Sequence, residues 1–372
     1  MRIGLNALLL SNGENYRQTG ISRYIEQLIA ALGEIASPSE LIAYIDRNSA
    51  VDHWPHVALR RTPVSVANPA VRIAWENAML PVLTRKDRLN VFHGMVNTLP
   101  VSVRGTSVLT VHDLAFLHYP EQVTARRYHY LNRMMGWSVK RADAILAPSE
   151  FTRGDILERF GADPSRVFVS PLGVDERFHP ASESEIGATC QRYRLDQGFI
   201  LSVGTIEPRK NLPRLVKAFV AIADQIPHDL VFVGPDGWLD DDIRASIDRS
   251  GVGTRVRRIG FVNDEELRAL YSGADVVAMP SLYEGFGLPV LEAMACGTAV
   301  VTSSSSSLPE VAGDAAQLVD PLSVESIANG LLSVLTNDSY RVELERESLL
   351  RVSSFTWQRT AECTMAAYRS VI

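Results

Sequence analysis

The sequence predicts an α/β protein built from two doubly wound domains, each with a parallel sheet covered by helices. Short apolar runs rich in β-branched residues alternate with longer segments of helical period along the whole chain. These runs fall into two series, separated by a polar, turn-rich stretch at Val174–Gly198 that we interpret as a linker. A chain of 372 residues with 46% hydrophobic composition also exceeds what one core usually holds. We therefore expect a first domain at residues 1–175 and a second at 198–354.

The first series contains six runs that are short and apolar enough to form buried strands. They are Ile3–Leu10, Leu41–Ile45, Val91–His93, Ser107–Val111, Ile145–Ala147 and Val167–Val169. After the first run, apolar residues recur at three- and four-residue steps and predict an amphipathic helix over Ile21–Ala36.

The second series repeats the same pattern after the linker. Its predicted strands are Phe199–Val203, Leu230–Val233, Val256–Ile259, Val276–Met279, Ala299–Thr302 and Gln317–Val319. The end of the chain, Phe355–Ile372, has apolar residues at helical steps and predicts a last helix. In doubly wound sheets, ligands are expected at the carboxyl ends of the strands.

Composition narrows the class of protein. The formal net charge of −6 argues against general nucleic-acid binding, which needs a basic surface. The first half is mildly basic, which permits contact with an anionic membrane surface. The three cysteines have no disulfide or zinc spacing, which favours a reducing cytoplasm. No stretch approaches 18 apolar residues, so we expect no transmembrane helix.

The loop Gly204–Asn211 lies between the strand Phe199–Val203 and a helix beginning near Leu212. Its adjacent cations, Arg209 and Lys210, stand where a strand leads into a helix, an arrangement suited to binding phosphate. A solvated pair of cations on a surface turn is the alternative. The position at the carboxyl end of a strand favours the phosphate clamp, and we include Thr205 of the same loop among the binding residues.

A second candidate segment runs from Glu284 to Glu292. Its glycines let backbone amides approach a ligand closely. Glu284 precedes the predicted helix Val290–Ala295 and Glu292 lies inside it, so two carboxylates could line one cleft and accept hydrogen bonds from sugar and ribose hydroxyls. The alternative is a glycine-bearing turn with two unrelated surface acids.

Two further candidates lie in the first half. His112 directly follows the strand Ser107–Val111, and Asp113 could orient it, although a lone histidine is more often structural. Gly20 stands at the start of the amphipathic helix, where its amide could meet a phosphate, although such a glycine is usually a cap.

Two charged clusters have competing interpretations. The run Asp240-Asp241-Asp242 is interpreted as capping a following helix, and since no other carboxylate cluster has metal-site spacing, we expect metal independence. A predicted basic amphipathic helix could lie on a membrane or be half-buried with a solvated polar face. Its residues are Arg126, Arg127, Tyr130, Leu131, Arg133, Met134, Met135, Trp137, Lys140 and Arg141.

Together these motifs resemble the GT-B glycosyltransferases of the retaining glycosyl transferases group 1 family, also called family 4. The resemblance rests on Gly204–Asn211, the Glu-x7-Glu signature within Glu284–Thr302, Leu308–Val311, Thr19-Gly20 and Val111–Asp113. It implies two Rossmann-like domains that face each other across a cleft, the first on the acceptor side and the second binding the nucleotide sugar. It also implies that the helix at 355–372 crosses back onto the first domain.

The resemblance assigns a role to each candidate. Arg209 and Lys210 would bind the donor diphosphate and stabilise it as it leaves, in place of a metal or any other cofactor. Glu292 would bind the ribose, while Glu284 and His112 would contact the donor sugar. The amides of Phe286, Gly287 and Leu288 would assist Glu284, and Gly20 would face the phosphates.

The segments His112–Glu121 and Thr19–Tyr24 also resemble bacterial mannosyl- and rhamnosyltransferases of O-antigen and exopolysaccharide assembly. GDP-mannose is therefore the expected donor, and a saccharide or lipid-linked saccharide at the inner face of the plasma membrane is the expected acceptor. Three alternatives stay open: a nucleotide-sugar epimerase, a sugar phosphorylase, or a non-catalytic protein that binds a nucleotide sugar.

Overall fold

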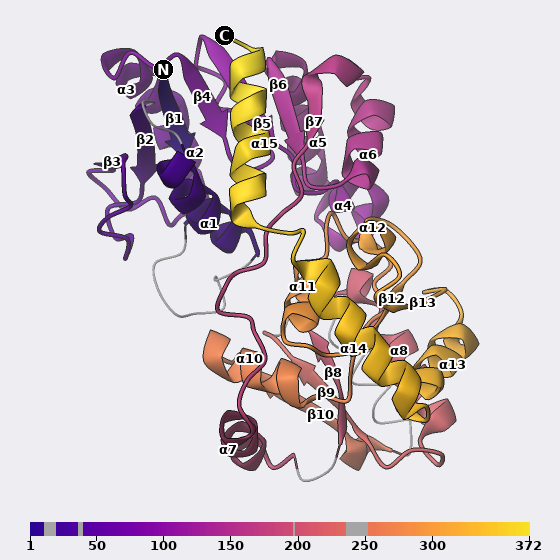
Figure 1. Ribbon diagram of the computed structural model, residues 1–372. Coiled ribbons are helices and arrows are strands. Elements are labelled where there is room, and N and C mark those ends of the chain that lie inside the picture. The colour runs from indigo at the N-terminus through magenta and orange to yellow at the C-terminus, as the bar shows by residue number, and fades with distance from the viewer. Residues whose placement is uncertain (11–19, 36–39, 196–197, 236–251) are drawn as a thin grey trace. The chain divides into compact units, whose positions relative to one another are not determined.

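The computed structural model describes residues 1–10, 20–35, 40–195, 198–235 and 252–372 (Figure 1). The chain divides into two compact units. Unit 1 comprises Met1–Gly173 together with Thr356–Ile372, and unit 2 comprises Val174–Phe355. Each unit holds one parallel sheet, so the predicted α/β class with two sheets is confirmed.

The sheet of unit 1 has seven parallel strands in the order β3-β2-β1-β4-β5-β6-β7. The strands are β1 (Arg2–Asn6), β2 (Glu40–Ile45), β3 (Val57–Arg61), β4 (Val91–Gly94), β5 (Thr106–Thr110), β6 (Ala144–Ala147) and β7 (Val167–Val169). The edge strand β3 was not expected, because only Val57 of its five residues is fully buried and two arginines end it. Strand β1 stops at Asn6 and not at Leu10, because a turn follows it.

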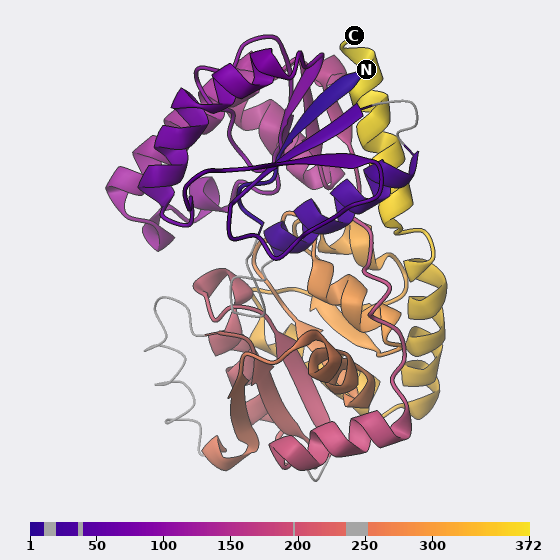
Figure 2. The ribbon, with the colours of Figure 1, turned by 90° about the vertical axis from the view of Figure 1, so that its left-hand side faces the viewer.

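Helices cover both faces of this sheet (Figures 1 and 2). They are α1 (Gly20–Ile35), α2 (Pro69–Ala78), α3 (Leu80–Lys86), α4 (Ala115–His118), α5 (Ala125–Arg141), α6 (Glu150–Phe160) and α15 (Trp357–Ser370), with short 3-10 turns at Pro120–Gln122 and Pro164–Arg166. Side chains of α2, α3, α5 and α6 share one core cluster with the sheet. Helix α15 packs against α1 and also contacts β6 and β7, so the last helix of the chain belongs to unit 1.

The sheet of unit 2 has six parallel strands in the order β10-β9-β8-β11-β12-β13. The strands are β8 (Phe199–Val203), β9 (Asp229–Val233), β10 (Val256–Gly260), β11 (Val276–Met279), β12 (Val300–Ser303) and β13 (Gln317–Val319). The helices are α7 (Glu183–Tyr193), α8 (Leu212–Ile222), α10 (Asp264–Gly273), α11 (Leu288–Ala295), α12 (Leu308–Ala312), α13 (Val324–Leu335) and α14 (Asp338–Val352), with 3-10 turns at Pro208–Lys210 and Gly253–Arg255. Apolar residues of α8 and α13 form one core cluster with the sheet.

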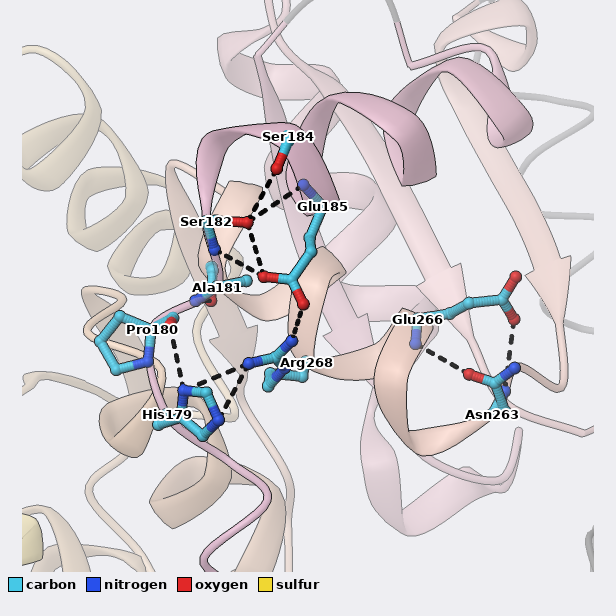
Figure 3. Close-up of polar contacts among 10 residues, drawn as sticks. His179, Pro180, Ala181, Ser182, Ser184, Glu185, Asn263, Glu266 and Arg268 are labelled. Carbon is cyan, nitrogen blue, oxygen red and sulfur yellow. Dashed lines mark hydrogen bonds and ion pairs between the residues drawn. The ribbon is translucent and has the colours of Figure 1, made fainter.

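The stretch at 174–198 is not only a linker, because it contains helix α7. Ser182 caps this helix: its hydroxyl accepts from the amide of Glu185 at 3.4 Å, and the Glu185 carboxylate accepts from the amide of Ser182 at 2.9 Å (Figure 3). The Glu185 carboxylate also forms an ion pair with Arg268 of α10, against which α7 packs. The Ser-x-x-Glu spacing was a sequence signal for this helix start that the linker interpretation overlooked.

In each sheet, the side on which successive strands are added changes once. In unit 1 this change lies between β1 and β4, and in unit 2 between β8 and β11. Such switch points leave a crevice at the carboxyl ends of the two central strands, where doubly wound proteins bind ligands. Among the described residues, no helix is long and apolar enough to cross a membrane.

Candidate active site

The candidate site of unit 2 begins at the carboxyl end of β8, where Gly204 makes room for a lysine. Gly204 has a φ of +137°, and a Cβ placed on it would lie 3.0 Å from Cε and 3.2 Å from Nζ of Lys210. Gly234, which follows β9, is so close to Gly204 that its own Cβ would lie 2.1 Å from the Gly204 carbonyl oxygen. Only glycine fits these positions without a shift, because larger residues would be strained and would collide with their neighbours.

The loop is tied to the end of the adjacent strand by Asn211, which sequence reasoning did not single out. Its backbone is left-handed, with a φ of 62°, a conformation that asparagine tolerates better than most residues. Its side-chain amide donates to the carbonyl oxygens of Pro280 at 2.9 Å and Pro321 at 2.6 Å. An asparagine directly before a helix was the available signal.

The structure brings Arg209, Lys210 and Glu284 together. Lys210 Nζ lies 2.7 Å from Oε1 of Glu284, and Arg209 donates to Oε2 at 2.6 Å. Arg209 also forms an ion pair with Glu207 at 2.5 Å. Burial alone would raise the pKa of the Glu284 carboxyl, but the charges of Arg209 and Lys210 and their hydrogen bonds outweigh it and lower this pKa to about 2. Glu284 is therefore a buried carboxylate on which two cations converge.

Serine side chains fix the segment around Glu284. The amide of Glu284 donates to the Ser306 hydroxyl at 3.1 Å. The Ser307 hydroxyl bonds the carbonyl oxygens of Glu284 at 2.9 Å and Phe286 at 2.8 Å. Sequence reasoning missed both serines, although the run of five serines at 303–307 marked the segment.

Helix α11 starts directly after this segment. Gly287 precedes it with a φ of +111°, and Leu288 is its first residue. Amides in the first turn of a helix lack acceptors within the helix and carry positive potential, so this end is suited to an anion or a hydroxyl oxygen. Phe286 is buried and packs edge-on against Phe355, with ring centroids 5.9 Å apart.

Glu292 has a different neighbour from Glu284. It is buried within α11, and its Oε2 accepts from the hydroxyl of Tyr271 on α10 at 3.1 Å. The two carboxylates expected to share one cleft thus take different partners: Glu284 bonds the two cations, and Glu292 bonds a tyrosine. Tyr271 was not predicted, because no sequence pattern links positions 271 and 292.

His112 lies in unit 1, just after β5. Its Nε2 is 2.9 Å from the carbonyl oxygen of Met95, and because a carbonyl only accepts, Nε2 must carry the hydrogen. Burial lowers the pKa of His112, although the bond to Met95 and the charge of Asp113 oppose this. The neutral ring therefore presents Nδ1 as a hydrogen-bond acceptor. The amide of His112 donates to Asn97 at 2.8 Å, which fixes the backbone as well.

A buried polar network adjoins His112 and was not predicted. The ring of Tyr24 packs edge-on against His112 with centroids 4.5 Å apart, and its hydroxyl lies 2.7 Å from Oγ1 of Thr110. Thr110 also bonds Nε2 of His93 at 2.8 Å, and Nδ1 of His93 bonds the hydroxyl of Tyr368 at 2.7 Å. Burial lowers the pKa of His93 to about 3, and the repulsion that would arise if His112 were protonated as well adds to this. Residues that are 86 and 275 positions apart in sequence meet here, which no local pattern reveals.

The remaining candidates are less informative. Gly20 is the exposed first residue of α1, and Thr205 is half-buried in the loop after β8. The Asp240–Asp242 run and Thr19 lie outside the described residues. Within the described part of the chain, no group of three or more His, Cys, Asp or Glu side chains is placed to hold a metal ion.

Comparison with known proteins agrees with these features. The model of the family "Glycosyl transferases group 1" matches residues 191–349, and that of "Glycosyltransferase Family 4" matches residues 19–178. The O-antigen chain mannosyltransferase B of Escherichia coli is 33% identical over 95% of this chain and 97% of its own length.

Solved structures resemble the fold over nearly the whole chain. Sucrose-phosphate synthase from Thermosynechococcus elongatus has a TM-score of 0.78 at 22% identity and covers 99% of this chain and 98% of its own. HepE from Anabaena, solved in complex with UDP and glucose, has a TM-score of 0.76 at 18% identity and covers both chains fully, at 100%. The chain therefore has the GT-B fold and belongs to the group 1, or family 4, glycosyltransferases.

Proposed function

We propose that this glycosyltransferase transfers mannose from GDP-mannose to a saccharide or lipid-linked saccharide in surface polysaccharide synthesis. The mannosyl assignment is supported by the 33% identity to a relative named as an O-antigen mannosyltransferase over nearly its full length. Family membership also favours glycosyl transfer over the epimerase, phosphorylase and non-catalytic alternatives.

The observation that carries the mechanism is the convergence of Arg209 and Lys210 on one anionic group. In the proposed reaction, the oxygen of an acceptor hydroxyl bonds to the anomeric carbon as the bond between that carbon and the diphosphate breaks, and the hydroxyl proton passes to an oxygen of the departing diphosphate. Negative charge then grows on the leaving diphosphate, and two preorganised cations in a buried setting would stabilise it. These cations would take the place of a metal, so we propose metal-independent transfer. Retention of the anomeric configuration is proposed from the family resemblance.

The other residues are assigned supporting roles. Glu292 would bind the ribose, and Glu284, with the amides of Phe286, Gly287 and Leu288, would hold the donor sugar. Glu284 would then exchange part of its bonding to the cations for sugar hydroxyls. Gly20 would offer its amide to the phosphates. Nδ1 of His112 would accept a hydrogen bond from a hydroxyl of the donor sugar.

The test measures GDP release from GDP-mannose with and without an acceptor, in EDTA, and compares UDP-glucose as donor. We expect GDP-mannose to be used as donor in the presence of EDTA. We also expect the one-bond C1–H1 coupling constant of the transferred mannose, measured by NMR, to show the same anomeric configuration as in the donor. Inverted product would refute retention, and activity restored only by a divalent cation would refute metal independence. Turnover of UDP-glucose alone would refute the donor assignment.

The membrane surface is part of the same proposal. Helix α5 carries basic residues, and Tyr130 is 43% exposed while Met135 is buried. Exposed basic and aromatic groups on one helix suit the surface of an anionic bilayer, where a lipid-linked acceptor would lie. Sedimentation with vesicles containing phosphatidylglycerol should retain the protein, and vesicles of phosphatidylcholine alone should not.

A further inference from the structure

Both sheets have the same kind of switch point, and a carboxylate occupies the one in unit 1. In unit 2 the cations and Glu284 follow the two strands at the switch point, β8 and β11. The corresponding strands of unit 1 are β1 and β4, which pair through Leu5 and His93 near their carboxyl ends. Asn6, the last residue of β1, donates from its side chain to Oε1 of Glu76 on α2 at 3.0 Å. A polar pair is therefore held where a doubly wound sheet binds a ligand.

Glu76 can accept more hydrogen bonds than the described residues donate to it. Glu76 is half-buried, and in the described part of the chain only its Oε1 has a hydrogen-bond partner. Burial raises its pKa, against the opposing effects of the Asn6 bond and the charge of Arg72.

A purely structural role does not account for this carboxylate. Glu76 stands in the last turn of α2, next to the negative end of the helix dipole, where an acid is unfavourable. It is also partly desolvated, and among the described residues only the charge of Arg72 and the bond from Asn6 offset this. Local preferences broken in this way are typical of functional positions.

We propose that Glu76, positioned by Asn6, binds a hydroxyl of the saccharide acceptor. This inference rests on the proposed function as a glycosyltransferase. The free carboxylate oxygen accepts a hydrogen bond from a sugar hydroxyl, so the subsite suits a polyhydroxylated ligand.

The test is Glu76→Gln, which preserves shape and can still accept from Asn6 through its amide oxygen. The matched control is Glu34→Gln, an exposed acid on α1. With GDP-mannose as donor and α-mannobiose as acceptor probe, we expect Glu76→Gln to raise the acceptor KM at least tenfold. GDP release into water without acceptor, and the Kd for GDP-mannose, should stay within twofold.

An unchanged acceptor KM in Glu76→Gln would overturn the proposal, and so would an equal loss of donor hydrolysis and acceptor use. Failure of the proposed function looks different: the wild type would then neither bind nor hydrolyse GDP-mannose. In that case NMR titration of both proteins with α-mannobiose still decides, because the proposal requires weaker saccharide binding by Glu76→Gln.

Discussion

Replacing Lys210 with methionine separates the catalytic from the structural use of its charge. The side chain of Lys210 is 7% exposed, and its ammonium lies 2.7 Å from Glu284. Breaking a buried ion pair usually costs about 3–5 kcal/mol because the partner charge is left uncompensated. Here Arg209 still bonds Glu284 at 2.6 Å, so we expect Lys210→Met to lower the free energy of unfolding by about 2 kcal/mol, below that range.

The effect on turnover should be larger than the effect on stability. One preorganised charge directed at a transition-state anion is typically worth about 10²–10³ in kcat. We expect a loss of that size in kcat for GDP-mannose with a smaller rise in KM, because the diphosphate is already anionic in the bound donor and gains further charge in the transition state.

A double variant and a surface control make this prediction sharp. Glu284→Gln combined with Lys210→Met removes both charges, so urea unfolding should recover most of the lost stability while turnover stays low. Lys217→Met, at an exposed position of α8, should change neither quantity. If Lys210→Met kept kcat within tenfold while losing stability, Lys210 would be structural only and its role at the diphosphate would be refuted.

Three further predictions concern other features of the two units. Gly204→Ala should reduce turnover at least tenfold, because the added methyl group displaces Lys210. The control Gly154→Ala adds a methyl group to open space on an ordinary helical backbone, so it should leave turnover unchanged and stabilise the protein by up to about 1 kcal/mol in urea unfolding. Equal turnover in the two variants would contradict the packing argument. The pKa of His93 is about 3 in the folded protein and near 6.5 in the unfolded chain, so between these pH values the unfolded state binds more protons. The free energy of unfolding should therefore fall as the pH is lowered from 6 to 4, by up to about 1.4 kcal/mol per pH unit in urea melts. A profile that stays flat over this range would refute the role of His93. Tyr368→Phe should cost about 1–2 kcal/mol, because it leaves a buried nitrogen of His93 unpaired, and a thermal melt matching the wild type would disprove that role.

The sequence predicted most buried strands well, because their apolar runs stand between clear turn signals. The ranges for β7, β8, β11 and β13 match the structure at both ends. Strand β3 was not predicted, because an edge strand buries few residues and the arginines at its end are typical of a loop. Helix α7 was hidden inside a polar stretch because its hydrophobic face is weak and none of its residues is fully buried.

The candidate site was predicted in part. The loop with Arg209 and Lys210 and the segment with Glu284 were identifiable, since each follows a recognisable strand. Their mutual pairing was not, because it depends on β8 and β11 being neighbours in the sheet, and periodicity does not reveal strand order. For the same reason the contacts of Tyr271 with Glu292 and of Tyr368 with His93 became visible only in three dimensions.

The discontinuous make-up of unit 1 has a consequence for biosynthesis. Ribosomes make Thr356–Ile372 only after all of unit 2, yet Tyr368 of this segment is fully buried against His93. During translation, the surface of unit 1 that α15 later covers therefore stays exposed to water while the whole of unit 2 is synthesised.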